Sequence, residues 1–201
     1  MDSSIVTAFI TGVAGPVAVL GVKYYLDKRK KKPDMVAEAL EVSEKVMNKL
    51  DYIKDEFHAD RVWITQFHNG GHFYPTGKSI AKFSMVYETI GVGAVSIQSS
   101  FHNIPVSLFS KSINHLLEND IIEIPDYKDE SIATYGLKYV AEESGCKSGY
   151  LFAIKTIDDK FIGTLGIDYT KRKTKLDMES INHLAVHATA IGGVLYNHLE
   201  K

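Results

Sequence analysis

The chain has 201 residues, of which 45% are hydrophobic, 24% charged and 10% aromatic, a mixture that supports a packed core and excludes a wholly disordered or collagen-like chain. One cysteine, Cys146, excludes a disulfide framework and a cysteine-based zinc finger. The formal net charge of -2 gives no overall reason to expect nucleic-acid binding. The length fits one domain with an appendage.

Residues 1–26 are predicted to form a transmembrane helix. The segment Ser3–Val22 carries no charged residue, and about 20 helical residues cross the apolar core of a bilayer. Pro16 and the neighbouring glycines are poor choices for a soluble helix but are tolerated in membrane helices. A cleaved signal peptide is the main alternative, although such peptides carry their positive charge before the apolar stretch. The second alternative is that this segment forms a buried hairpin of a soluble domain.

Residues 27–33 form a basic juxtamembrane linker. The first 33 residues carry a net charge of +4, whereas the remaining 168 carry -6. Because cationic flanks stay on the cytoplasmic side, we expect a single-pass protein of the inner (cytoplasmic) membrane with its C-terminal domain in the cytoplasm. Anionic lipid is an expected partner of the basic linker. The residues expected at the membrane interface are Lys23, Tyr24, Tyr25, Lys28, Arg29, Lys30, Lys31 and Lys32.

Residues 34–58 are predicted to form an amphipathic helix, with Asp34 as its N-cap. Apolar residues recur there at alternating spacings of three and four, which is typical of a coiled-coil seam. A helix packed on its own domain shows a similar stripe, and both interpretations hold if the first part pairs with another chain while the second part covers a sheet. The stripe consists of Val36, Ala39, Ser43, Val46, Leu50, Ile53 and Phe57.

From Arg61 onwards the pattern changes to that of an α+β domain with an antiparallel sheet flanked by helices. In Arg61–Phe67, Val62, Ile64 and Gln66 alternate with Trp63, Thr65 and Phe67, as expected of a strand. The other predicted strands are Ala81–Glu88, Gly93–Gln98, Ile121–Ile124, Gly149–Thr156 and Phe161–Tyr169. The predicted helices are Ser107–Glu118, Ser131–Ser144 and Met178–Leu199, the last capped by Asp177.

The chain resembles GAF-type sensory domains over about residues 40–201, and residues 59–201 are assigned as the GAF-like domain itself. The resemblance is carried by RVWITQFHNGG, by the hairpin SGYLFAIKTIDDKFIGTLGIDYTK and by the final helix LDMESINHLAVHATAIGGVLYNHL. It implies a non-catalytic regulatory module that binds a small ligand or protein partner and forms a dimer or higher homo-oligomer through its first and last helices. It identifies no cofactor.

The chain also resembles the single-span holin of T-even phages, around FIGTLGIDYTKRKTKLDMESINHLA. This resemblance implies a second function, a phage membrane-assembly or lysis protein whose soluble domain controls oligomerisation of the span. The predicted span lies at the N-terminus and is followed by the basic linker, which argues against an exported domain.

A ligand site is predicted where the first strand ends. His68, Asn69, His72 and Tyr74 lie in one polar and aromatic run there, and His102 with Asn103 repeats the His-Asn pair. Two loops with the same pair converge on one site in this hypothesis, together with Tyr87 and Glu88 at a strand end. The alternative is that Asn69-Gly70 simply turns the chain and His68 bonds a neighbouring backbone group.

No catalytic or metal-binding residue is predicted. His183 and His187 have the one-turn spacing of metal ligands but lack the glutamate of a zincin motif, so they are interpreted as ordinary helix-face residues. Cys146 is interpreted as a small packing residue. The sequence leaves open whether an apolar pocket remains in the domain or is filled by Phe83, Met85 and Phe101.

Overall fold

The computed structural model describes residues 10–29, 34–75, 82–130 and 138–199. It contains two compact units, Met1–Glu38 and Ala39–Lys201. In the first unit, a π-helical turn, η1 (Ile10–Ala14), precedes the helix α2 (Gly15–Arg29). In the described part of the chain, no helix has both the length and the apolar character needed to cross a membrane. The predicted span of residues 1–26 extends over residues 1–9, and Lys30, Lys31 and Lys32 of the predicted interface also lie outside the described residues.

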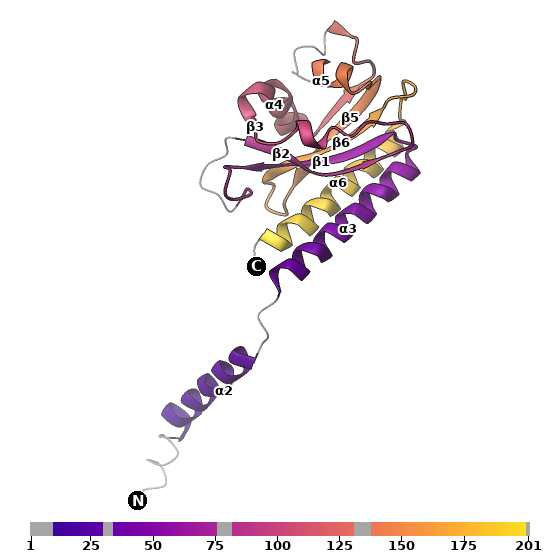
Figure 1. Cartoon of the computed structure of the whole chain (residues 1–201). Helices are drawn as coiled ribbons and strands as arrows, with labels where there is room; N and C mark the ends of the chain where they lie inside the picture. The colour runs from indigo at the N-terminus through magenta and orange to yellow at the C-terminus, as the bar shows by residue number, and fades with distance from the viewer. Residues whose placement is uncertain (1–9, 30–33, 76–81, 131–137, 200–201) are drawn as a thin grey trace, which may run out of the picture. The chain divides into compact units, whose positions relative to one another are not determined.

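The second unit is built on a six-stranded antiparallel sheet, in the order β3-β2-β1-β6-β5-β4 (Figure 1). The sequence pattern therefore predicted the α+β class correctly. The strands are β1 (Arg61–His68), β2 (Lys82–Ile90), β3 (Ile104–Pro105), β4 (Ile121–Ile124), β5 (Ser148–Lys155) and β6 (Phe161–Tyr169).

Both faces of the central strand β1 are buried. Val62 and Ile64 belong to one apolar cluster, and Trp63 and Phe67 belong to another on the opposite face. Successive side chains of a strand point to opposite faces, so the alternation predicted over Arg61–Phe67 is confirmed.

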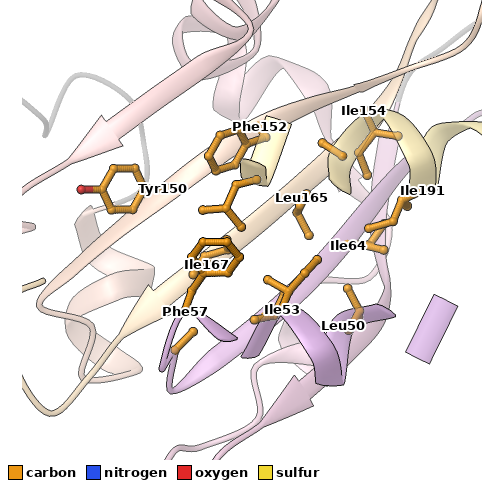
Figure 2. Packing of buried hydrophobic residues seen from close by; sticks show 14 of the residues in the cluster. Leu50, Ile53, Phe57, Ile64, Tyr150, Phe152, Ile154, Leu165, Ile167 and Ile191 are labelled. Atoms are coloured by element: carbon orange, nitrogen blue, oxygen red, sulfur yellow. The ribbon is translucent and has the colours of Figure 1, made fainter. Parts of the chain in front are cut away.

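Two long helices, α3 (Met35–Glu56) and α6 (Met178–Leu199), cover one face of the sheet (Figure 1). The predicted N-caps are confirmed, because Asp34 Oδ1 accepts the Val36 N–H at 2.9 Å and Asp177 Oδ1 accepts the Ser180 N–H at 2.8 Å. Figure 2 shows the apolar core between these helices and the sheet. Its members from these helices include Leu50, Ile53, Leu184, Ile191 and Leu195, and Phe57 joins them directly after the end of α3.

The stripe on α3 is divided between two environments. Val46, Leu50, Ile53 and Phe57 are buried against the sheet. At the beginning of the helix, by contrast, Val36 is 67% exposed. The packed-helix interpretation therefore holds for the second half of α3, and a coiled coil remains a prediction for the first half.

The opposite face of the sheet carries shorter helices, namely η3 (Val106–Phe109), α4 (Ser110–Asn119) and α5 (Lys138–Glu143) (Figure 1). The apolar cluster on this face is rich in aromatic rings. It includes Trp63, Phe67, Phe83, Phe101, Tyr127 and Phe161.

Two predicted elements differ from the structure. Gly93–Gln98 is not a strand, because the Glu88 carboxylate accepts the N–H groups of Ile97 and Gln98 and holds this segment in an irregular turn before the 3-10 helix η2 (Gln98–Ser100). The edge of the sheet is formed instead by β3, which pairs with β2. Of the predicted helix Ser131–Ser144, the described part is helical over Lys138–Glu143, and residues 131–137 lie outside the described residues.

Candidate functional site

His68, the last residue of β1, is held in one orientation by hydrogen bonds to both ring nitrogens. Nδ1 accepts the backbone N–H of Gly70 at 3.0 Å, so this nitrogen carries no proton. In the neutral ring the proton is then on Nε2, which donates to Ser84 Oγ at 2.8 Å. Burial, and next the charge of Lys82, lower the pKa of His68, which favours the neutral ring over the protonated one.

Ser84 connects the two loops that carry the His-Asn pairs. Its Oγ accepts from His68 Nε2 and also from the backbone N–H of Asn103, at 2.9 Å. With both lone pairs engaged, the hydroxyl group retains its proton as a donor. Ser84 is one of the residues that line the cavity at the end of β1.

This cavity has a volume of about 360 Å³ and opens at the end of β1. It brings together His68, His72 and His102, three of the residues predicted for the ligand site. Ser84 and Gln98 add polar groups that the sequence did not indicate, since an isolated serine or glutamine gives no signal of its own. The remaining lining residues are Gly70, Gly71, Phe73, Met85 and Val86.

Asn69 and Asn103 shape the backbone beside the cavity. Asn69 Oδ1 accepts the N–H groups of Gly71 and His72 at 3.0 and 2.9 Å, which is the turn-forming role given as the alternative. Asn103 has a φ of 56°, a left-handed conformation that asparagine tolerates well, and its N–H reaches Ser84.

Tyr74, Tyr87 and Glu88 do not line the cavity. Tyr74 packs against the apolar core. The register of β2 against β1 shifts between Ile64 and Thr65, so the extra residue turns Tyr87 towards α3, where its hydroxyl lies 3.4 Å from Ser43 Oγ. Glu88 binds the turn that follows β2.

The apolar face of the sheet beneath α4 is almost filled by side chains. Its cavity has a volume of about 40 Å³ and is lined by Phe83, Phe101 and Phe109 among others, whereas pockets for small molecules usually enclose about 300–1,000 Å³. Met85 is fully buried in the same cluster. The question that the sequence left open is therefore answered for the described residues: aromatic rings fill this space.

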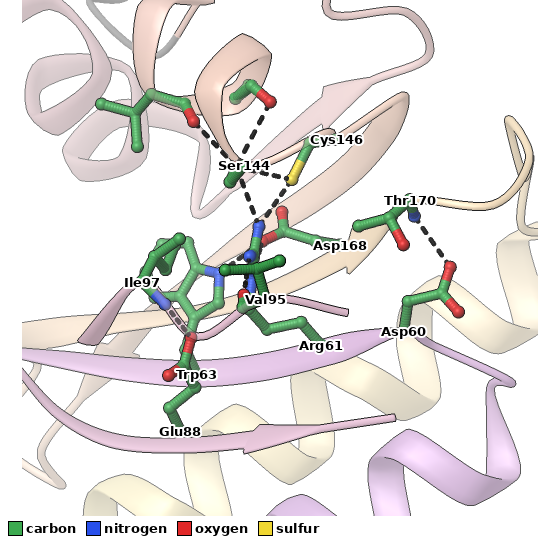
Figure 3. A network of polar contacts seen from close by, with 12 residues as sticks. Asp60, Arg61, Trp63, Glu88, Val95, Ile97, Ser144, Cys146, Asp168 and Thr170 are labelled. Carbon is green, nitrogen blue, oxygen red and sulfur yellow. Dashed lines mark hydrogen bonds and ion pairs between the residues drawn. The ribbon is translucent and has the colours of Figure 1, made fainter. Parts of the chain in front are cut away.

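A buried ion pair lies at the other end of β1 (Figure 3). Arg61, which is 0% exposed, donates from Nε to Asp168 Oδ2 at 2.8 Å and from Nη1 to the carbonyl of Val95. The same carboxylate accepts the indole N–H of Trp63 at 2.9 Å. These bonds join β1, β6 and the turn after β2, which is a structural role.

Cys146 contacts this ion pair, since Arg61 Nη2 lies 2.6 Å from its Sγ. Burial, followed by the negative charge of Asp168, raises the pKa of the Cys146 thiol to about 12. A thiol that stays protonated at neutral pH is a poor nucleophile, in agreement with the packing role expected of Cys146.

In the comparisons with known proteins, no family model and no curated sequence matches the chain. Several solved structures, however, are similar to this chain. A far-red cyanobacteriochrome photoreceptor is 13% identical with a TM-score of 0.62, and the match covers 92% of this chain and all of that one. The GAF domain region of a putative membrane protein from Geobacter sulfurreducens is 12% identical with a TM-score of 0.60, covering 82% of this chain and 99% of that one.

A protein solved in a far-red-absorbing dark state with bound biliverdin IXα is similar at 13% identity, with a TM-score of 0.60 over 82% of this chain and 98% of that one. The fold of this chain is therefore that of GAF domains, as the sequence resemblance implied. These three structures give no support to the holin resemblance.

The pKa shift of His68 predicts a loss of stability in acid. Because the folded state lowers this pKa, the unfolded chain takes up the proton first, and stability should fall as the pH drops from about 6.5 through the folded pKa. Replacing His68 with glutamine should reduce the slope of unfolding free energy against pH between pH 7 and 5. Urea unfolding across this range measures the slope, and an unchanged slope would contradict the assignment. Between pH 7 and 9 the two proteins should show equal slopes.

Proposed function

We propose that this chain is a non-catalytic, sensory GAF module whose histidine-lined cavity binds a small ligand rich in hydrogen-bond acceptors. The observation that carries this proposal is the convergence of His68, His72 and His102 on one cavity of about 360 Å³. Its volume lies in the range of small-molecule sites. A bilin-sized ligand under α4 is not part of the proposal, because the cavity there holds about 40 Å³.

The chemistry of the lining defines the ligand class. No carboxylate is among the described residues that line the cavity, and Ser84 offers a hydroxyl donor. His72 and His102 supply further donors when protonated or in the appropriate tautomer, and the ring of Phe73 supplies an apolar surface. A small carboxylate, a phosphate ester or an acceptor-rich heterocycle fits this set.

The ligand would act by shifting a population between two arrangements of the module. The ligand can shift this population only by as much as its affinity differs between the two arrangements. The cavity lies beside β1 and β2, and β1 also packs through Val62 and Ile64 against the core beneath α3 and α6. A change in the strand ends can therefore reach these two helices through packed side chains.

The full chain should be screened for changes in melting temperature with three sets of probes: inorganic phosphate, small di- and tricarboxylates, and nucleoside monophosphates. A probe present at 100 times its Kd stabilises by about 2.7 kcal/mol, which for a chain of this length raises Tm by about 5–10 °C. The double variant His72→Ala/His102→Ala should lose this rise. His58→Asn, a change outside the cavity, should keep it.

Native mass spectrometry of the full chain, purified without denaturation, complements the screen by detecting a ligand retained from the cell. Absence of both a stabilising probe and a retained ligand would contradict the proposal. A rise in Tm that persists in the double variant would place the ligand elsewhere.

We also propose that the module pairs with a second copy through the first half of α3. Val36, the first residue of the predicted coiled-coil stripe, is 67% exposed there, and Leu40, which lies one turn further along and beside that stripe, is 65% exposed. Native mass spectrometry should therefore show an even number of subunits. Replacing both residues with glutamate should give the monomer, and a wild-type monomer would contradict this part of the proposal.

Residues 1–33 are proposed to hold the module at the cytoplasmic face of the inner membrane. Support comes from the uncharged run Ser3–Val22 and the basic residues after it, and from the exposed apolar side chains of α2, such as Val17 and Leu20. The full chain should sediment with phosphatidylserine-containing vesicles and stay bound in 1 M NaCl, because salt screens only the electrostatic contribution. Release by salt would contradict insertion.

A further inference from the structure

The C-terminal end of α3 meets the first turns of α6 in a cluster of three potential metal ligands. Glu56 is the last residue of α3, and His183 and His187 are one helical turn apart on α6. One Glu56 oxygen lies 3.2 Å from His183 Nδ1, and the other lies 3.6 Å from His187 Nε2. One ligand atom from each of the three residues can be chosen so that all lie within 4.8 Å of one another.

His187 carries an unsatisfied buried nitrogen at this point. Its side chain is 12% exposed, and among the described residues its Nε2 has no hydrogen-bond partner. Buried polar atoms without a partner are rare in folded proteins, and each one requires an explanation. The nitrogen faces the Glu56 carboxylate at 3.6 Å, which is too long for a hydrogen bond but suits two atoms that share a metal ion.

An aromatic ring contacts each of the two imidazoles. The centroid of the Tyr52 ring lies 5.5 Å from that of His187, and the Phe57 ring lies 5.9 Å from His183. The two imidazoles lie 4.7 Å apart, centroid to centroid. These ring contacts restrict the orientations of the two imidazoles, as is common around metal sites, while the His183 side chain remains 48% exposed.

We propose that Glu56, His183 and His187 bind a divalent transition-metal ion, with Zn²⁺ as the best fit, and that the ion ties the end of α3 to α6. Two imidazoles and one carboxylate suit Zn²⁺ and its neighbours, whereas Mg²⁺ and Ca²⁺ prefer oxygen ligands. Metal–ligand distances of about 2.1 Å place the ligand atoms of a tetrahedral site about 3.4 Å apart. Each imidazole nitrogen is close to this distance from one Glu56 oxygen, His183 Nδ1 from Oε1 at 3.2 Å and His187 Nε2 from Oε2 at 3.6 Å.

The site differs from the histidine-lined cavity in both position and chemistry. It links the two helices that share one face of the sheet, and these helices are also the proposed route of signal output. Bound metal would hold them in one arrangement, and its removal would allow them to separate at this end. The proposal does not depend on a ligand in the cavity.

Isothermal titration calorimetry on the tag-free full chain, after removal of metal with a chelator, tests the proposal. Zn²⁺ should bind saturably with one ion per chain, and Mg²⁺ should give no heat. Co²⁺ should give the visible absorption bands of a four-coordinate nitrogen and oxygen site. His187→Ala should weaken Zn²⁺ binding by at least about 10-fold, in line with the cost of disturbing a metal site.

Two further variants keep the test decisive if His187→Ala does not fold. Glu56→Gln and His183→Ala change side chains that are more exposed, and each should also weaken Zn²⁺ binding by at least about 10-fold. His72→Ala/His102→Ala is the matched control and should bind Zn²⁺ as the wild type does. Absence of Zn²⁺ binding, or binding that survives the Glu56 and His183 changes, would overturn the proposal. Loss of binding only in the control would assign the metal to the cavity instead.

Discussion

Replacing Arg61 with alanine should lower the free energy of unfolding by about 3–5 kcal/mol, the usual cost of breaking a buried ion pair by removing one partner. Arg61 is 0% exposed, and its guanidinium binds Asp168, the carbonyl of Val95 and the side chains of Ser144 and Cys146. Alanine would leave the Asp168 carboxylate buried without its cation. Urea unfolding followed by circular dichroism measures the change.

A double-mutant cycle separates the ion pair from the cavity that alanine leaves. Asp168→Asn keeps an acceptor for the Trp63 indole N–H while removing the negative charge. Arg61→Met/Asp168→Asn should therefore be destabilised by clearly less than the sum of the effects of Arg61→Met and Asp168→Asn. Additive effects, or a loss below about 1 kcal/mol in Arg61→Ala, would show that the ion pair contributes little.

The second large effect is expected at Gly192, where α6 lies against β5. A Cβ atom at this position would lie 2.2 Å from the carbonyl oxygen of Lys155 and 3.3 Å from the side chain of Ile154. Because the first contact is with backbone, the helix must move away from the sheet. We expect Gly192→Ala to cost about 3 kcal/mol, at the upper end of the usual range for overpacking.

Gly193 is the matched control, because it lies in the same turn of α6 but a Cβ there would meet no atom within 4 Å. Gly193→Ala should stabilise the chain by up to about 1 kcal/mol, since alanine favours helix over glycine. Thermal unfolding of the two variants under identical conditions gives the difference. Equal stabilities would contradict the close packing of α6 on β5.

Much of the fold was predictable from side-chain periodicity. Phe161–Tyr169 and Met178–Leu199 have the bounds predicted for them, because a period of two and a period of 3.6 are unambiguous over nine and 22 residues. Gly93–Gln98 was predicted wrongly as a strand. The carboxylate of Glu88, which lies outside this segment, holds the turn. The pattern of apolar residues within Gly93–Gln98 therefore could not indicate it.

The candidate site was predictable only in part. The repeated His-Asn pair predicted one shared ligand site, and in the structure His68 and His102 line one cavity, where ligand binding stays a prediction. Tyr87 was misplaced, because the register shift in β2 turns it towards α3. Ser84 was missed, because a serine inside a strand gives no local sign that its hydroxyl connects two loops.

The interpretation of His183 and His187 shows the same limit. Their spacing was visible in the sequence, but the glutamate beside them comes from the end of another helix, 127 positions earlier in the chain. Contacts between distant segments depend on how α3 and α6 pack on the sheet, which no local motif encodes. The metal site proposed for Glu56, His183 and His187 therefore arises from the fold.

A crystal structure of the full chain with the probe that most raises its melting temperature is the decisive measurement for the histidine-lined cavity. We expect density for the probe in the space lined by His68, His72 and His102, with the Ser84 hydroxyl as a donor to it. Density beneath α4, on the aromatic face of the sheet, would contradict the proposed ligand site, because it would require the rings of Phe83 and Phe101 to move apart.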